Sequence, residues 1–116
     1  MPNRKDLVRI QHMLDAMRKS EEFIRGRCRA DLDSDEKLTL ALIRLLEIIG
    51  EAAKAVSFSL QKRYPKVSWR EIAGTRDRLI HGYFDVDLDI VWEIVSKDLP
   101  ALTPELEKML SGEKKK

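Results

Sequence analysis

The segment Glu36–Arg63 constrains the fold more than any other part of the chain, because it contains no proline and only one glycine, Gly50. Eight leucine and isoleucine residues between positions 38 and 49 leave little polar face in its first half. A helix that is apolar nearly all round is buried on more than one side. We therefore predict a long central helix, ended by Tyr64-Pro65, that packs inside an all-α bundle and contacts a second copy of the chain in a homodimer.

Segments before and after this helix also carry helical signals. Residues 4–24 place leucine, isoleucine and methionine side chains on one face, at the period of an amphipathic helix. Ser68 and Glu71 have the spacing of a capping box, in which both side chains bind orphan backbone N–H groups. This pattern predicts a helix that runs from Ser68 towards His81 and is terminated by Gly82.

The C-terminal third has the signals of two further helices. Asp85 or Asp87 can cap the first of them, and Pro100 is expected to interrupt it. Thr103-Pro104 suits the start of the second, with threonine at the cap and proline at the first helical position. No segment with the alternation of a β-strand competes, so the fold class is predicted to be all-α.

Length and charge narrow the class of protein further. The 116 residues suit one domain, which we expect to be a four- to five-helix up-and-down bundle over residues 1–112 with a basic disordered tail over residues 113–116. The 22 basic and 20 acidic residues are too balanced to indicate nucleic-acid binding by themselves. The sequence has no membrane-spanning run and no signal segment, so we expect a cytoplasmic protein with no membrane partner.

The sequence contains few cysteine and histidine residues that could form a metal site. Cys28 is the only cysteine, which excludes an intramolecular disulfide and a cysteine-built zinc site. His12 and His81 are the only histidines, and they do not have the spacing of zinc ligands. The run Asp85–Asp89 lacks the glycine turn and the terminal glutamate of a calcium loop, and helix capping explains it better. We expect no metal and no cofactor.

Residues 76–83 gather the groups best able to move protons or bind phosphate. Asp77 and His81 would lie one turn apart on a helix, where the carboxylate could orient the imidazole. Histidine can act as acid and base near neutrality, and arginine suits charge developing on phosphorus. Together they suffice for RNA cleavage in which the 2′-OH attacks the adjacent phosphate. The alternative is a surface ion-pair network that includes Arg78, with Tyr83 packed over a helix end.

The spacing Arg76-x4-His81-x-Tyr83 resembles the motif of HepT-like toxins, a branch of the HEPN superfamily of helical ribonucleases. Further segments of the chain are similar to that family: Leu46–Lys54, Trp69–Ala73 and Asp98–Leu102. The resemblance therefore covers most of the chain, from about residue 5 to about residue 110.

This resemblance implies a HEPN-like bundle that dimerises and cuts RNA without a metal, with Arg76 and His81 as the catalytic pair in a cleft between the two copies. It also implies the toxin of a toxin–antitoxin pair, whose partner is a minimal nucleotidyltransferase antitoxin that attaches AMP to Tyr83. A bulky, anionic nucleotide beside the cleft would repel RNA phosphate and block its entry.

Three further residues are expected to support this site: Asp77, Arg78 and Glu51. The alternative function is a catalytically idle helical binding subunit of a nucleotidyltransferase complex. In that case the motif residues would persist for nucleotide binding, and a variant at His81 would leave complex formation intact.

Overall fold

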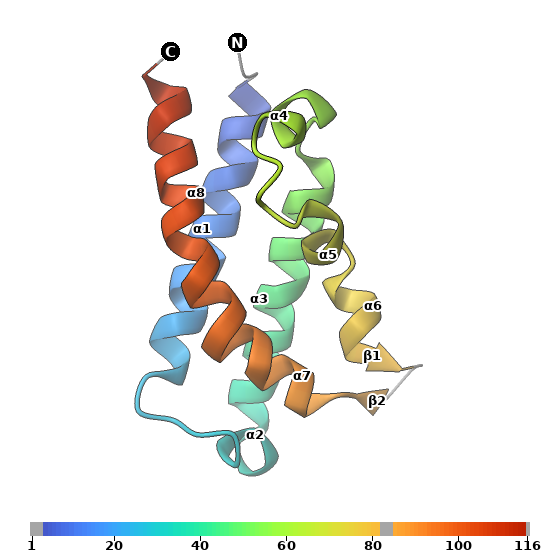
Figure 1. Ribbon diagram of the computed structural model, residues 1–116. Coiled ribbons are helices and arrows are strands. Elements are labelled where there is room, and N and C mark those ends of the chain that lie inside the picture. Colours follow the sequence, from blue (N-terminus) through green and yellow to red (C-terminus); the bar gives the residue numbers. More distant parts are fainter. Residues whose placement is uncertain (1–3, 82–84, 116) are drawn as a thin grey trace.

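The computed structural model describes residues 4–81 and 85–115, and it confirms the all-α fold class. The elements in chain order are α1 Arg4–Ile24, α2 Asp31–Ser34, α3 Glu36–Ala55, α4 Phe58–Arg63, α5 Trp69–Ala73, α6 Thr75–Leu79, β1 Ile80–His81, β2 Asp85–Val86, α7 Leu88–Glu93, the π-helix η1 Ile94–Asp98 and α8 Leu99–Lys114. Helix α1 descends in Figure 1, α3 ascends, α5 and α6 descend, and α7 to α8 ascend. This is the up-and-down bundle that the sequence predicts.

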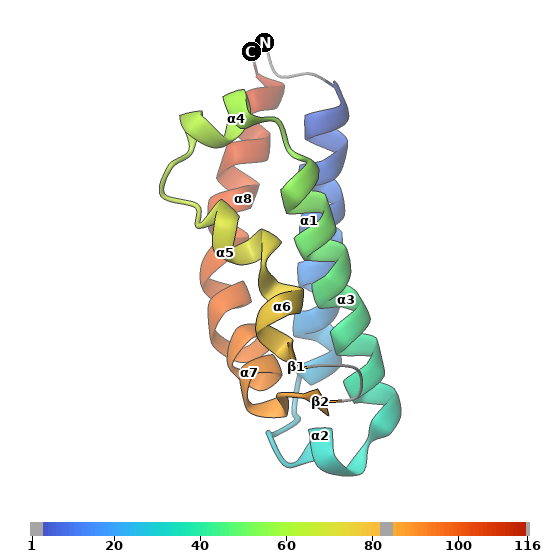
Figure 2. The same ribbon diagram turned by 90° about the vertical axis from the view of Figure 1, so that its right-hand side faces the viewer.

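The core follows from the spacing of apolar residues on the three long helices. On α1, Ile10, Met13, Leu14 and Met17 recur at helical spacing and are at most 1% exposed. They pack with the buried apolar face of α3 and with that of α8, as Figure 2 shows from the side. On the outer face of α3, Leu40 is 58% exposed. The homodimer that would cover this face remains a prediction.

The long central helix breaks earlier than predicted, because α3 ends at Ala55 and α4 begins at Phe58. Asp6, buried on α1, accepts hydrogen bonds from the backbone N–H of Ser57 at 2.9 Å and from its hydroxyl at 2.5 Å. Ser57 in turn caps α4 by accepting from the N–H of Leu60. A buried carboxylate needs such donors, and this tertiary contact overrides the continuous helical pattern.

The helix predicted from Ser68 towards His81 is two short helices, and it ends early. Gly74 separates α5 from α6, and α6 stops at Leu79. Ser68 makes no side-chain capping bond, so the expected capping box does not form. His81 lies in β1, which pairs antiparallel with β2. This two-residue ladder is too short to give an alternating pattern in the sequence.

The C-terminal helices are more continuous than predicted. Asp87 caps α7, as expected, by accepting from the N–H groups of Asp89 and Ile90. Pro100 does not interrupt the chain, because the π-helix η1 leads into α8 with proline in its first turn, where a missing N–H does little harm. Helix α8 continues to Lys114, beyond the domain boundary expected at residue 112.

The end of α8 is held by a buried carboxylate. Glu113 is 2% exposed; it accepts a 2.7 Å hydrogen bond from the hydroxyl of Tyr64 and forms a 2.6 Å ion pair with Arg63. These contacts explain why the helix extends into the segment expected to be a disordered tail. No helix in the described ranges combines the length and the apolar character that a membrane crossing needs.

Candidate active site

Helix α6 holds Arg76 at the surface through two buried residues at its ends. Thr75 is 6% exposed and its hydroxyl donates to the carbonyl of Ile72 at 2.7 Å. Leu79 is fully buried at the other end. Residues four apart share a face of a helix, so the residues between Thr75 and Leu79 turn outward. Arg76, Asp77 and Arg78 are accordingly exposed.

The segment before α6 is docked closely against α3. Gly50 faces the end of α5, and a Cβ atom there would lie 3.2 Å from the carbonyl oxygen of Ile72. Trp69 is 7% exposed, and its indole N–H donates to the carbonyl of Tyr64 at 3.1 Å. Close backbone approach at Gly50 and the buried indole therefore fix α5, and with it the start of α6.

His81 follows α6 by two residues and lies in the β1–β2 ladder. The register pairs Ile80 with Val86 and His81 with Asp85. The N–H of Asp87 donates to the carbonyl of Leu79 at 2.8 Å and closes the ladder at its other end. Because α6 has ended before His81, the helical i, i+4 relation expected between Asp77 and His81 does not apply.

The motif residues lie on more than one element. Arg76 and His81 lie on consecutive elements, α6 and β1. Tyr83, the residue expected to receive AMP, and Gly82, the expected helix terminator, lie outside the described residues. From the sequence, Asp85 is expected only as a possible helix cap. No sequence pattern predicts its register opposite His81.

Arg78 lines a cavity of about 370 Å³ between α5–α6 and the helical run from η1 to α8. Leucine and isoleucine side chains of α3, α5 and α8 form much of its wall. The charged residues that line it are two cations and three carboxylates: Lys66, Arg78, Glu71, Asp98 and Glu105. This balance does not favour RNA phosphate, so the cavity beside α6 differs in character from a phosphate-binding cleft.

Glu51 lies in a different part of the surface from the motif. Together with Arg9, His12 and Arg44 it lines a hollow of about 290 Å³ between α1 and α3. No described residue of α6 or β1 lines this hollow. The structure therefore does not bring Glu51 together with Arg76 within one chain.

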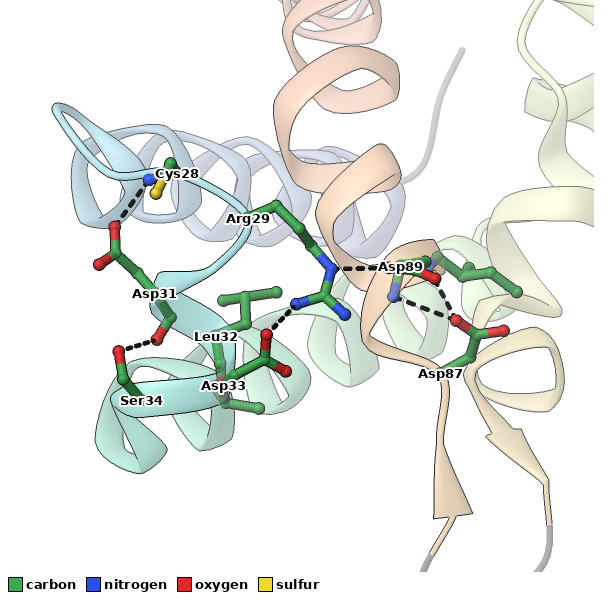
Figure 3. A network of polar contacts seen from close by, with 10 residues as sticks. Cys28, Arg29, Asp31, Leu32, Asp33, Ser34, Asp87 and Asp89 are labelled. Carbon is green, nitrogen blue, oxygen red and sulfur yellow. Dashed lines mark hydrogen bonds and ion pairs between the residues drawn. The ribbon is translucent and has the colours of Figure 1, made fainter.

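An exposed polar network holds the start of α7 beside the ladder. The guanidinium of Arg29 donates to Asp89 at 2.7 Å and to Asp33 at 3.1 Å, which joins α2 to α7 (Figure 3). The hydrogen bond to Asp89 is the main cause that raises the pKa of Arg29. Asp87, next to Asp89 in Figure 3, uses its carboxylate to cap α7.

Potential metal ligands do not gather anywhere in residues 4–81 and 85–115. No group of three or more histidine, cysteine, aspartate or glutamate side chains within these ranges could hold an ion. The motif itself contributes an arginine on α6 and a histidine on the following strand, β1.

Sequence comparisons define the class of protein as a family of ribonucleases. The family described as "Ribonuclease HepT-like" matches residues 13–109. The chain belongs to this HepT-like ribonuclease family, and its family membership supports an RNase activity of the HEPN type.

Individual relatives cover most of the chain. A protein of Thermococcus cleftensis named "Probable ribonuclease HepT" is 41% identical over 100 residues, which are 86% of this chain and 91% of that protein. A protein of Caldanaerobacter subterraneus named "Putative RNase" is 40% identical over 105 residues, covering 90% of this chain and 94% of the relative. No solved structure matches the chain significantly.

Proposed function

We propose that this chain is a metal-independent RNA endonuclease and the toxin of a toxin–antitoxin pair, with Arg76 and His81 as its catalytic pair. The observation that carries the proposal is the anchoring of α6: buried Thr75 and Leu79 display Arg76 on the surface and lead directly into the strand of His81. Membership of the HepT-like ribonuclease family supports the same activity.

The proposed reaction uses the side chains of the motif and the RNA. The imidazole of His81 takes the proton of a 2′-OH, and the 2′-oxygen attacks the adjacent phosphorus. The bond from phosphorus to the 5′-oxygen breaks, which leaves a 2′,3′-cyclic phosphate on one product. The 5′-oxygen leaves with a proton donated by an imidazolium. Arg76 stabilises the negative charge that builds up on the phosphate oxygens.

Cleavage by the purified protein in EDTA tests this function directly. We expect wild-type protein to cut RNA, and His81→Ala and Arg76→Ala to lose at least about 100-fold in rate, the usual contribution of a general base or of a charge-stabilising group. His12→Ala and Arg25→Ala are matched controls, because both residues are exposed outside the motif. A wild type that leaves varied RNAs uncut would favour the idle binding subunit instead.

A homodimer is part of the proposal, because each chain supplies one motif histidine, His81, and the two proton transfers are simplest with two such histidines. An exposed leucine on the outer side of α3 supports it, since Leu40 is 58% exposed. Sedimentation should show a dimer for wild type and a monomer for Leu40→Glu. Phe58→Glu is the matched control, because Phe58 is 70% exposed on α4 and should leave the dimer intact. A dimer that survives Leu40→Glu would place the interface elsewhere.

The proposed partner is a nucleotidyltransferase antitoxin that uses ATP. The phenol oxygen of Tyr83 attacks the α-phosphorus of ATP, pyrophosphate leaves, and the phenol proton passes to a base of the transferase. The only other tyrosine is Tyr64, whose hydroxyl already donates to Glu113. Burial, and then this hydrogen bond, raise the pKa of Tyr64, which makes it a poor nucleophile.

Intact mass after incubation with the transferase and ATP tests this modification. We expect one AMP group on wild type and on Tyr64→Phe, and none on Tyr83→Phe. Modified protein should lose RNA cleavage, while Tyr83→Phe should keep it in the presence of the transferase. An AMP group that persists on Tyr83→Phe would refute the assignment.

A further inference from the structure

Phe58 is the most exposed large apolar residue in the described part of the chain, at 70% exposure. It is the first residue of α4 and directly follows Ser57, which caps that helix. Leu60, two residues further on and so on the opposite side of the helix, is fully buried. Helix α4 therefore packs through the side of Leu60 and displays Phe58. One exposed apolar residue is ordinary by itself, so its surroundings decide what it can do.

Those surroundings are positively charged. Phe58 lines a hollow of about 470 Å³ between α4 and α5. The charged residues that line this hollow are exposed, and they are two cations, Lys62 and Arg70, and one carboxylate, Glu71. The ammonium of Lys62 lies 4.7 Å from the centre of the Phe58 ring, which is within the range of a cation–π contact. In the cavity beside Arg78, by contrast, carboxylates outnumber cations.

The two helices that form the hollow are held in place by contacts behind it. Ser57, at the start of α4, donates its backbone N–H and its hydroxyl to the buried Asp6. Trp69, in α5, is 7% exposed, and its indole N–H donates to the carbonyl of Tyr64 at 3.1 Å. The helices that carry the ring and the cations are thus fixed before a ligand arrives, which lowers the entropic cost of binding.

The lining of the hollow suits a nucleic-acid strand better than a protein surface. Besides Phe58 and the buried Trp69, its remaining residues are polar or charged, and they include Gln61 and Ser68. The core of a protein interface is apolar and depleted of charged residues. A single exposed ring beside cations is instead what a base and its phosphates require, since aromatic rings stack on bases and cations follow the backbone.

The hollow also lies close to the motif along the chain. Figure 1 shows α4, α5 and α6 following one another along one side of the bundle, and only Gly74 separates α5 from α6. Arg76 follows Arg70 by six residues, which span roughly 9 Å at the rise of an α-helix. A stacked strand covers that distance in about three nucleotides. One RNA strand can therefore reach both places.

We propose that the hollow between α4 and α5 is a contact site for single-stranded RNA, in which one base stacks on the ring of Phe58. Lys62 and Arg70 bind the phosphates beside that base. The inference rests on the proposed function for its ligand, RNA, and it adds a contact outside the motif. Because every base has a π face, this contact strengthens binding without selecting a sequence.

Binding of a strand that cannot be cut tests the proposal without any need for activity. The probe is a short fluorescent 2′-O-methyl RNA, which lacks the attacking 2′-OH, and anisotropy gives its Kd at fixed salt. Phe58→Ala should weaken binding at least about fivefold, the lower end for one lost base stack, and Phe58→Trp should keep it. Phe23→Ala is the matched control, because Phe23 is also exposed but follows Glu21 and Glu22, and it should bind as wild type does.

A strand of the same backbone without bases separates stacking from charge. Phe58→Ala should bind this abasic probe as wild type does. Lys62→Gln and Arg70→Gln should weaken the binding of both probes, and each should reduce the slope of log Kd against log salt by about 0.7. Equal affinity of wild type and Phe58→Ala for the base-bearing probe, or an equal loss with the abasic probe, overturns the proposal.

Cleavage and partner binding are read separately. In an active enzyme Phe58→Ala should raise KM and leave kcat unchanged, as expected for a contact made equally in the ground state and the transition state. If wild type binds the probe through Phe58 but cuts no RNA, the proposed ribonuclease fails and the contact site stands. If Phe58→Ala keeps its affinity for RNA but loses the nucleotidyltransferase, the hollow is a protein-binding surface and the proposal is overturned.

Discussion

The two ends of the bundle are held by polar contacts that differ in burial. At the terminal end, where the start of α1, α4 and the end of α8 lie together (Figure 1), the acidic residues Asp6 and Glu113 are 1% and 2% exposed. At the motif end, formed by α2, the ladder and the start of α7, Arg29 bridges Asp33 and Asp89, whose side chains are 64% and 84% exposed.

This difference in burial means that the polar contacts at the two ends contribute unequally to stability. A buried carboxylate that loses its partners remains desolvated, and this lowers stability. The same holds for buried partners that lose their carboxylate. Exposed ion pairs are replaced by water at little loss. The terminal end therefore contributes to the free energy of unfolding, and the motif end can carry a high density of charged residues without a comparable effect on stability.

The largest effect on stability is expected at Glu113. Glu113→Ala leaves the hydroxyl of Tyr64 and the guanidinium of Arg63 without their buried partner. We expect the free energy of unfolding to fall by about 2–4 kcal/mol. Urea denaturation at a fixed protein concentration measures it, since a dimer would make the midpoint concentration-dependent. Glu107→Ala is the matched control, because Glu107 on the same helix pairs with Arg18 at an exposed position. Equal losses in the two variants would contradict the comparison.

A smaller effect at the same end depends on pH. Burial first, and then the hydrogen bond to Glu113, raise the pKa of Tyr64 above its ordinary value of 10.0. The folded state therefore holds the phenol proton more tightly than the unfolded state. This contribution is complete below the ordinary pKa and is lost as the pH rises through the raised one.

We expect wild type to lose more stability than Tyr64→Phe between neutral pH and a pH above about 10. Urea denaturation of both proteins at the two pH values measures the difference, and the comparison removes the titration of lysines that they share. Identical alkaline losses would show that Tyr64 titrates as it does in the unfolded chain. At neutral pH, Tyr64→Phe should cost about 1 kcal/mol for the lost hydrogen bond.

The sequence predicts the helical scaffold, but it does not show the tertiary contacts that decide where some of the helices end. Apolar periodicity predicts the core faces of α1 and α3, and Asp35 and Asp87 cap helices as short polar residues are expected to. The break after Ala55 depends on Asp6 and Ser57, which are 51 residues apart, so no local pattern shows it.

The same limit applies at the candidate site. Helical spacing selected Asp77 as the partner of His81, and that selection depends on a helix that reaches His81. The helix stops at Leu79, where the N–H of Asp87 binds its carbonyl, and the pairing with β2 brings Asp85 opposite His81 instead. Two-residue strands have no sequence period, so only the structure shows this register.

The smallest effect is expected at Arg29, at the motif end. Although Arg29 binds two aspartates, Arg29→Ala should leave the urea midpoint almost unchanged, because its pairs are exposed and screened. Its effect should instead appear in hydrogen exchange, as faster exchange of the amides of Asp89 and Ile90 at the start of α7. Arg18→Ala is the matched control, since it removes an exposed ion pair with Glu107 that lies away from the ladder. A midpoint shift as large as that of Glu113→Ala would mean that the motif end, too, determines the stability of the bundle.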